Sequence, residues 1–459
     1  MLQNTEYRLG NYLKWLHRTT DFSIVMKRRQ LDMTKKVRLL LAVLRVIALV
    51  LFLAVVAGMV LTVITNDYVW AIYSALLILL APHILSYGIL IPLFVGWLFI
   101  QKPRERAMIS RARKTLSEHA GYRIAIAGSF GKTTAKEILL AVLSEGKKVA
   151  ATPGNMNTAI GISRFIQKLN GDEDVLIFEL GEEKVGDVRR LSRLTRPQAG
   201  IITGINEAHL ASFKSLENTV STIFELADFV EGPKLFVNGE SQLVKKHKKA
   251  DQIVFDRKSV HGWKVSNATT AVSGTEFTLS KADVSIQAQT SLVGLHTVGI
   301  TAAVMVIAYE LGLTVKEIEQ GLRNVKAFEH RMEPRPLHGA WLIDDTYNGN
   351  SEGVQAGLAF LKTVDAKRRI YVTPGLVEQG DKTESVHEMI GETAASSADI
   401  VVLMQNSTTE FIKKGLKRKK FKGQLIEVDD PLEFYSNLEH FIAAGDVVLM
   451  QNDWTDNYQ

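Results

Sequence analysis

The sequence of 459 residues contains no cysteine. This absence excludes disulfides, iron–sulfur clusters and thiolate zinc sites, and it is typical of a reducing compartment. Proline is also scarce, with 10 residues, and 46% of all residues are hydrophobic, which excludes disorder over most of the chain. A chain of this length is long enough for two or three domains.

Excess positive charge is confined to two short segments. The formal net charge is +6, yet residues 27–45 carry seven basic residues and one acid, and residues 101–114 carry six basic residues and one acid. The remainder of the chain is therefore slightly acidic. Because no basic stripe runs through the rest of the sequence, we expect no nucleic-acid partner.

The region between the two basic segments is almost free of charge. Residues 46–64 hold no charged side chain and are long enough to cross a bilayer as a helix. We expect a second crossing over residues 69–90, followed by an interfacial or kinked continuation, since Pro82 and Pro92 disfavour one straight helix. Basic residues on both sides predict a transmembrane helical hairpin with both ends in the cytoplasm, hence a multi-pass protein of the cytoplasmic membrane. The alternative is a pair of buried helices in a soluble protein.

A glycine-rich loop follows the second basic segment. Residues 122–127 (YRIAIA) predict a short buried strand, and a helical pattern begins at residue 135. Between them, glycines allow backbone N–H groups to point at phosphate oxygens, and the helix N-terminus adds its positive dipole end. We expect Lys132 to reach the β- and γ-phosphates of ATP and the Thr133 hydroxyl to bind Mg²⁺. The predicted nucleotide-binding residues of this loop are Gly128, Ser129, Gly131, Lys132, Thr133 and Thr134.

Several distinctive stretches follow the loop in a fixed order. They are residues 154–161 (GNMNTAIG), 175–181 (VLIFELG), 196–210 (RPQAGIITGINEAHL), 237–240 (VNGE), 331–333 (RME) and 344–350 (DDTYNGN). Together with the loop, they resemble the motifs of the Mur ligases, ATP-dependent amide ligases that build the peptidoglycan stem peptide. The resemblance extends over roughly residues 121–449 and is closest to the branch that adds D-alanyl-D-alanine.

The resemblance implies roles for individual residues. Glu179 and His209 would bind metal, Arg331 would meet phosphate, and Asp345 would meet the nucleotide ribose. An amide ligase converts a carboxylate into an acyl phosphate that an amine attacks, so its site needs cations rather than a protein nucleophile. We therefore expect ATP and Mg²⁺ as cofactors. The expected catalytic residues are Lys132, Glu179, His209 and Arg331, and the expected metal ligands are Thr133, Glu179 and His209.

The sequence also departs from the family pattern. Ile223 stands where the family has a carbamylated lysine that bridges two cations, so the second cation would lack a ligand unless Glu217 or Glu225 replaces it. Thr297 and Ile300 stand where the family has asparagines that help to hold adenine. These departures support an alternative reading as a catalytically degenerate protein that binds nucleotide or precursor and scaffolds other enzymes.

The expected fold is α/β after a helical membrane anchor. Residues 1–115 would form the membrane-anchoring region, residues 116–328 the P-loop Mur-ligase central domain, and residues 329–459 a Rossmann-like C-terminal domain, because strands and helices alternate there. The family's usual first domain, which binds the UDP end of the substrate, has no room here. We therefore hypothesise a membrane-associated precursor as substrate.

The predicted function is a membrane-anchored, ATP-dependent amide ligase of peptidoglycan precursor synthesis that adds D-alanyl-D-alanine or a similar amine. Its expected partners are the cell-wall precursor, an amino acid or dipeptide and the membrane, with other cell-wall synthesis enzymes as further candidates. A P-loop ATPase that drives transport is a weaker alternative, because the DDTYNGN stretch argues against it.

Three further features are open to two interpretations. Residues 2–29 suit either an amphipathic surface helix or a small folded cap. His387 lies where the family has a histidine, or it simply packs within a helix. The basic run over residues 413–422 is either a solvated face or a contact for anionic lipid or substrate carboxylates.

Overall fold

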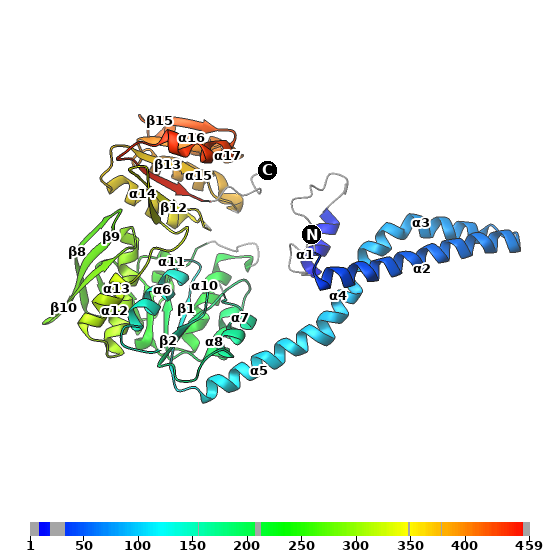
Figure 1. Ribbon diagram of the computed structural model, residues 1–459, viewed down its shortest axis with the longest axis horizontal. Helices are drawn as coiled ribbons and strands as arrows, with labels where there is room; N and C mark the ends of the chain where they lie inside the picture. Colours follow the sequence, from blue (N-terminus) through cyan, green and yellow to red (C-terminus); the bar gives the residue numbers. More distant parts are fainter. Residues whose placement is uncertain are drawn as a thin grey trace. The chain divides into compact units, whose positions relative to one another are not determined.

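The computed structural model describes residues 9–18, 33–154, 156–206, 213–347, 349–377 and 379–452. They belong to two compact units, Met1–Ser110 and Arg111–Gln459. The described residues of the first unit are mainly helical, and the second unit contains two β-sheets covered by helices (Figure 1).

Two long helices dominate the first unit. Helix α2 (Lys35–Thr65) begins at Thr34, whose hydroxyl accepts a hydrogen bond from the Val37 N–H, and it ends at Asn66 in the left-handed conformation. Helix α3 (Val69–Gly88) follows after a short turn and packs along α2 (Figure 1). The first predicted crossing lies within α2, and the second covers α3 and the first residue of the next helix.

Small residues allow α2 and α3 to approach closely. Ser74 donates a hydrogen bond of 3.1 Å from its hydroxyl to the carbonyl of Val55 on the neighbouring helix. A Cβ atom at Gly58 would lie 2.3 Å from the Ser74 hydroxyl oxygen, so a larger residue would force the helices apart. Close backbone approach at small residues is typical of helix pairs in membranes.

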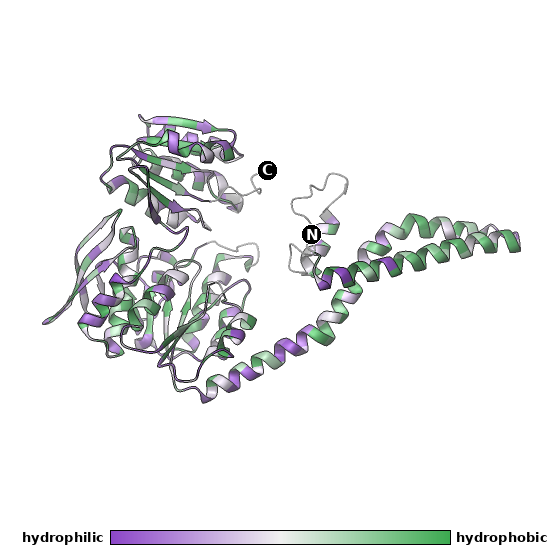
Figure 2. Cartoon of the chain, viewed as in Figure 1, coloured by the Kyte–Doolittle hydropathy of each residue, from purple (hydrophilic) through white to green (hydrophobic). Residues whose placement is uncertain are grey.

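Most residues of these two helices are hydrophobic (Figure 2). The helix Lys35–Thr65 and the helical stretch that begins at Val69 are each long and apolar enough to cross a membrane, by length and composition alone. In the most apolar 18-residue segment of each, only 6% is buried inside the protein. This exposure disfavours the alternative of buried helices in a soluble protein, because such helices would bury their apolar side chains.

After α3 the chain remains helical, but the type of helix changes. It proceeds through α4 (Leu90–Gly96), the π-helical turn η1 (Trp97–Gln101) and α5 (Lys102–Glu118). Pro82 lies inside α3, whereas Pro92 lies in the first turn of α4, where its missing N–H has no intrahelical partner to lose. The Lys102 ammonium lies 4.9 Å from the centre of the Trp97 ring, a cation–π distance.

A short helix, α1 (Leu9–Arg18), packs against α3 and α4. The Tyr12 hydroxyl donates a hydrogen bond of 3.1 Å to the carbonyl of Ser86 in α3, and α1 also contacts α4. This part of the N-terminal region is therefore a helix that docks on the other helices. The remainder of residues 2–29 lies outside the described residues.

The larger sheet of the second unit has ten strands in the order β10-β9-β8-β7-β6-β5-β4-β1-β3-β2. The parallel strands are β1 (Tyr122–Ala127), β2 (Val149–Ala151), β3 (Val175–Glu179), β4 (Ala199–Ile202), β5 (Leu235–Asn238) and β6 (Ile253–Phe255). The antiparallel extension consists of β7 (Ser259–Val260), β8 (Trp263–Ala271), β9 (Gly274–Lys281) and β10 (Val284–Thr290).

Helices cover both faces of this sheet. The first face carries α6 (Lys132–Leu143), α12 (Val298–Glu310) and α13 (Val315–Arg323), which share one core with alternate residues of the strands. The second face carries α7 (Ala159–Ile166), α8 (Asp187–Thr195) and α10 (Leu216–Phe224). The shorter elements are η2 (Glu225–Asp228), η3 (Gly232–Lys234), α11 (Gln242–His247) and η4 (Leu295–Thr297). Strand β3 is buried along its whole length, as expected for a parallel strand covered on both faces.

The second sheet has six strands in the order β11-β12-β16-β13-β14-β15, parallel except for the β11–β12 pair. The strands are β11 (Glu333–Leu337), β12 (Ala340–Asp345), β13 (Arg369–Thr373), β14 (Ile400–Met404), β15 (Gln424–Val428) and β16 (Val447–Gln451). The helices are α14 (Ser351–Thr363), η5 (Gly380–Lys382), α15 (Thr383–Ala394), α16 (Thr409–Arg418), α17 (Pro431–Ser436) and α18 (Leu438–Phe441). Separate apolar cores lie on its two faces, which confirms the expected α/β class.

The boundaries between the expected regions remain predictions. The sequence places the end of the anchoring region at residue 115, whereas the second compact unit begins at Arg111, inside α5. Residues 111–459 form one compact unit that includes both sheets.

Candidate active site

The glycine-rich loop lies between β1 and α6, at the carboxyl edge of the larger sheet. Strand β1 is parallel to both β3 and β4, and Ile126 lies opposite Glu179 in the β1–β3 register. The segments that follow these three strands therefore meet at one edge, where open α/β sheets bind ligands. A hydrogen bond of 2.7 Å from the Ser129 N–H to the Gly204 carbonyl joins two of these segments.

The backbone of the loop explains its glycines. Gly128 has φ +144°, and a Cβ atom there would lie 2.2 Å from the hydroxyl oxygen of Thr203. Gly131 has φ +79° and directly precedes α6. Within the described part of the chain, the buried Ser129 hydroxyl oxygen has no hydrogen-bond partner. A loop with an unsatisfied hydroxyl at a helix N-terminus fits a phosphate group.

Lys132 forms a buried ion pair that the sequence did not predict. Its ammonium donates hydrogen bonds of 2.9 Å to each carboxylate oxygen of Glu182 and a further hydrogen bond to the Gly128 carbonyl. The side chain of Lys132 is 12% exposed and that of Glu182 is 3% exposed. Burial raises the pKa of Glu182 to about 7, although the Lys132 charge and hydrogen bond oppose the rise.

Thr133 and Glu179 form the second part of the site. The Thr133 hydroxyl donates a hydrogen bond of 3.1 Å to Glu179, and the Asn157 amide donates one of 3.3 Å to the other carboxylate oxygen. The fully buried ammonium of Lys136 lies 3.2 Å from Glu179 and donates a hydrogen bond of 2.7 Å to the Gly154 carbonyl. A hydroxyl and a carboxylate in contact are oxygen ligands of the kind that Mg²⁺ prefers.

Neither Glu217 nor Glu225 is part of this group. His209 lies outside the described residues. Ile223 is fully buried. Glu225 is bonded to Arg189, whose N–H donates a hydrogen bond of 2.9 Å to it, and Glu217 is exposed in the first turn of α10. Among the expected ligands that the structure describes, Thr133 and Glu179 are therefore the pair that would hold a cation.

Thr297 and Ile300, which stand where the family has asparagines, make contacts within the protein. The Thr297 hydroxyl donates a hydrogen bond of 2.8 Å to the Gly294 carbonyl, and Ile300 packs against the core of the larger sheet. Neither Thr297 nor Ile300 offers an amide to a base.

Arg331 and Asp345 form a separate group beside the second sheet. The Arg331 guanidinium lies 4.8 Å from the centre of the Tyr347 ring. Burial raises the pKa of Asp345 to about 6, against hydrogen bonds from Gln451 (2.7 Å) and the Met332 N–H (3.2 Å) and against the Arg331 charge. The structure thus brings these two residues together and groups Lys132, Thr133 and Glu179 independently.

His387 packs within the second sheet's core. It is fully buried, its Nε2 accepts a hydrogen bond of 2.9 Å from the Leu376 N–H, and its Nδ1 lies 2.6 Å from the Thr383 carbonyl. Burial lowers its pKa. With both ring nitrogens bonded to backbone, the packing interpretation holds.

Three of the seven basic residues in the run over residues 413–422 pair with acidic neighbours. Lys413 pairs with Glu410 and Glu427. Lys414 and Arg418 both pair with Glu388 on α15, and further partners are Glu384 and Glu392. The remaining four, Lys417, Lys419, Lys420 and Lys422, are exposed, so both interpretations of the run remain predictions.

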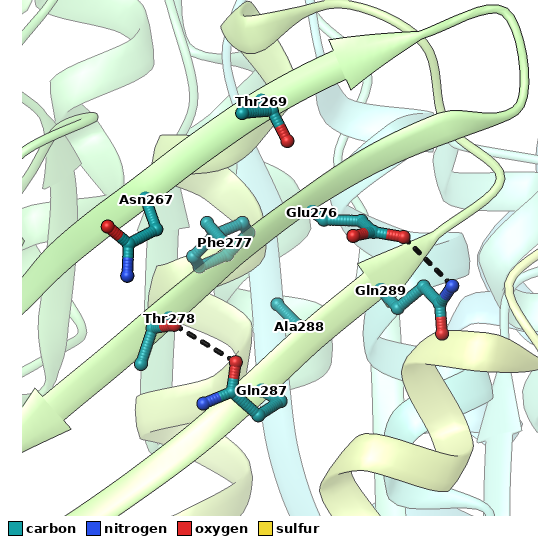
Figure 3. Close-up of a pocket in the computed structure, with 8 residues that line it drawn as sticks. All are labelled: Asn267, Thr269, Glu276, Phe277, Thr278, Gln287, Ala288 and Gln289. Carbon is teal, nitrogen blue, oxygen red and sulfur yellow. Dashed lines mark hydrogen bonds between the residues drawn. The ribbon is translucent and has the colours of Figure 1, made fainter.

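A cavity also lies on the exposed face of β8, β9 and β10 (Figure 3). Its lining consists of Asn267, Thr269, Glu276, Phe277, Thr278, Gln287, Ala288 and Gln289. Cross-strand hydrogen bonds of 2.9 Å join Thr278 to Gln287 and Gln289 to Glu276. The lining carries no cationic side chain for a phosphate, so the candidate active site remains the glycine-rich loop.

Glu182 and Lys136 were missed by the sequence reasoning. Glu182 follows Glu179 by three positions and so lies just beyond the end of a strand adjacent to β1, which is a recognisable signal. Lys136 follows Lys132 by four positions and so shares its helix face.

Comparison with known proteins extends over both sheets. The Mur ligase middle domain matches residues 126–308, and the Mur ligase, glutamate ligase domain matches residues 330–451. A UDP-N-acetylmuramoyl-tripeptide–D-alanyl-D-alanine ligase of Treponema pallidum is 30% identical over 337 residues, which are 72% of this chain and 71% of that protein. The protein of the same name from Escherichia coli is 29% identical over 287 residues, and the match spans 60% of this chain and only 62% of that relative's length.

Solved structures share the fold. MurF from Acinetobacter baumannii superposes with a TM-score of 0.66 at 21% identity and covers 76% of this chain and 77% of its own. MurF ligase from Thermotoga maritima, in complex with ADP, gives a TM-score of 0.65 at 24% identity over 76% of this chain and 80% of its own. The matched domains and the relative at 30% identity show that this chain belongs to the Mur ligase family.

Proposed function

We propose that the chain is an ATP-dependent amide ligase of peptidoglycan precursor synthesis, which joins D-alanyl-D-alanine or a similar amine to a muramoyl-peptide carboxylate. The observation that carries the proposal is the grouping of Lys132, Thr133 and Glu179 at the carboxyl edge of β1 and β3. The names of the relatives support the substrate class.

The reaction requires the protein to bind the substrates and to supply positive charge, and it requires no nucleophile from the protein. A carboxylate oxygen of the precursor attacks the γ-phosphorus of ATP, and ADP leaves. The amine nitrogen then attacks the acyl carbon, phosphate leaves with the bonding electrons, and the nitrogen loses a proton. The loop N–H groups and Lys132 would bind the β- and γ-phosphates, and Thr133 and Glu179 would hold Mg²⁺, which neutralises phosphate charge. Arg331 and Asp345 would contact phosphate and ribose.

The same proposal includes a membrane anchor. Helices α2 and α3 would cross the cytoplasmic membrane as a hairpin, with the two sheets in the cytoplasm. Its support is the apolar, exposed surface of these helices and the basic segments over residues 27–45 and 101–114 on both sides. An enzyme held there suits a membrane-associated precursor, so full-length enzyme in nanodiscs should turn over a lipid-linked muramoyl-tripeptide faster than the soluble UDP-linked form.

The test of the ligase is phosphate release from Mg-ATP by the full-length chain in detergent, with D-alanyl-D-alanine and a muramoyl-tripeptide acceptor. We expect acceptor-dependent release that falls by about 10²-fold or more in Lys132→Met. Because this change leaves Glu182 buried without its partner, the double variant Lys132→Met/Glu182→Gln is measured in parallel. Lys148→Met is the matched control, since Lys148 is an exposed lysine paired with Asp172.

The alternative predicts a different result. A catalytically degenerate scaffold would bind nucleotide or precursor without any acceptor-stimulated release that depends on Lys132. The observation in its favour is the packing of Ile223, Thr297 and Ile300 at positions where the family has functional side chains.

A further inference from the structure

The Lys132 ammonium contacts three oxygens within the protein. Two are the carboxylate oxygens of Glu182, both at 2.9 Å, and the third is the Gly128 carbonyl oxygen. A lysine ammonium has three donors. A phosphate group that accepts a hydrogen bond from Lys132 would therefore compete with the Glu182 carboxylate for the same ammonium.

The backbone holds Glu182 in this position. The N–H of Gly181 donates a hydrogen bond of 2.9 Å to the Asn157 carbonyl, and a Cβ atom at Gly181 would lie 2.8 Å from the Asn157 side chain. The N–H of Leu180 extends the pairing with β1 through a bond of 2.9 Å to Ile126. The two residues directly before Glu182 are thus bonded to β1 and to the Asn157 segment, and the carboxylate contacts Lys132.

Glu182 also adds negative charge where negative charge is unfavourable. Its carboxylate is 3% exposed, and the charge of Glu179 lies close enough to act on it. The β- and γ-phosphates that Lys132 would bind carry further negative charge, and in a poorly solvated site like charges repel strongly. Glu182 and a polyphosphate therefore compete for one cation.

We propose that Glu182 is an internal competitor of nucleotide phosphate: without nucleotide its carboxylate holds Lys132, and ATP binding displaces it. This inference rests on the proposed function, because it requires that the loop binds ATP. Nucleotide binding must break the Lys132–Glu182 pair. The free energy that this costs lowers the apparent affinity for nucleotide. In the opposite role, Glu182 would position Lys132 and stay bonded to it in the nucleotide complex. Loss of Glu182 would then weaken nucleotide binding.

Titration calorimetry of the full-length chain in detergent distinguishes the two roles. Mg-ATP, Mg-ADP and AMP are titrated into the wild type, Glu182→Gln and the control Glu183→Gln, which removes the same charge from an exposed neighbour. We expect Glu182→Gln to bind Mg-ATP about tenfold more tightly or better. AMP affinity should not change, because AMP lacks the phosphates that Lys132 would bind, and Glu183→Gln should match the wild type.

Two results would overturn the inference. An unchanged or weaker Mg-ATP affinity in Glu182→Gln, with a wild type that binds ATP, refutes the competitor while leaving the ligase proposal intact. Absence of ATP binding in both proteins refutes the inference together with the proposed function. Tighter binding without any ligation supports the competitor and counts against the ligase alone. Glu182→Ala, checked by thermal unfolding, provides the same comparison if the glutamine variant does not fold.

Discussion

The Thr133 hydroxyl donates a hydrogen bond of 3.1 Å to the Glu179 carboxylate. This contact joins the first turn of α6, which follows β1, to the last residue of β3, and it exists because the two strands are parallel neighbours. Two oxygen ligands from different segments are thereby held together before any cation binds, which lowers the cost of ordering them.

Thr133→Val keeps the shape of the side chain and removes its oxygen. We expect Mg²⁺-dependent phosphate release to fall by about 10²-fold, because one ligand of the cation beside the phosphates is lost. Thr133→Ser retains the hydroxyl and should stay close to the wild type. The measurement is phosphate release over a Mg²⁺ titration, and an unaltered Mg²⁺ dependence in Thr133→Val would show that this hydroxyl is not a ligand.

Lys136→Met should destabilise the chain far more than Lys148→Met. Lys136 is fully buried against Glu179 and the Gly154 carbonyl, so its loss leaves a buried carboxylate unpaired and costs about 3–5 kcal/mol. Lys148 pairs with Asp172 at the surface, where such pairs contribute about 1 kcal/mol or less. Urea unfolding followed by circular dichroism measures both, and equal shifts of the two midpoints would contradict the prediction.

The contribution of Glu173 to stability should disappear in acid. Burial raises its pKa, but hydrogen bonds from His119 (3.0 Å), Asn170 and Gly171 outweigh burial and lower the pKa to about 2. A carboxyl whose pKa is lower when folded stabilises fully above its unfolded value near 4.5 and loses this effect as pH falls toward 2.

We therefore expect Glu173→Gln to unfold more easily than the wild type at pH 7, with a difference that shrinks between pH 5 and pH 2. Unfolding curves of both proteins across this range supply the measurement. Asp172→Asn removes an exposed carboxylate from the same loop and serves as control. A difference that stays constant down to pH 2 would argue against the lowered pKa.

The absence of cysteine makes the membrane topology directly measurable, because any introduced thiol is the only one. Thr65→Cys lies at the end of α2 beside the turn to α3, and Ser117→Cys lies near the end of α5. A maleimide that does not cross membranes should label Thr65→Cys in intact spheroplasts and Ser117→Cys only after lysis. Equal labelling of both positions before lysis would exclude the proposed hairpin.

The sequence by itself determined the features that depend on local composition and spacing. The uncharged stretches appear as α2 and α3, because a long apolar run satisfies its backbone most readily as a helix. The glycine-rich loop falls between a strand and a helix, because Gly128 and Gly131 adopt positive φ angles that other residues rarely reach. The alternation of strands and helices was likewise sufficient for the α/β class.

The tertiary structure decided which charges meet. The pair of Lys132 with Glu182 and the contact of Lys136 with Glu179 depend on the parallel register of β1 and β3, which brings together residues that are 50 and 43 positions apart in the sequence. Composition and spacing do not specify this register, because it results from the packing of both sheet faces. The same packing placed Ile223 in the core and bonded both ring nitrogens of His387 to backbone, so the uses of these positions could be read only from the folded chain.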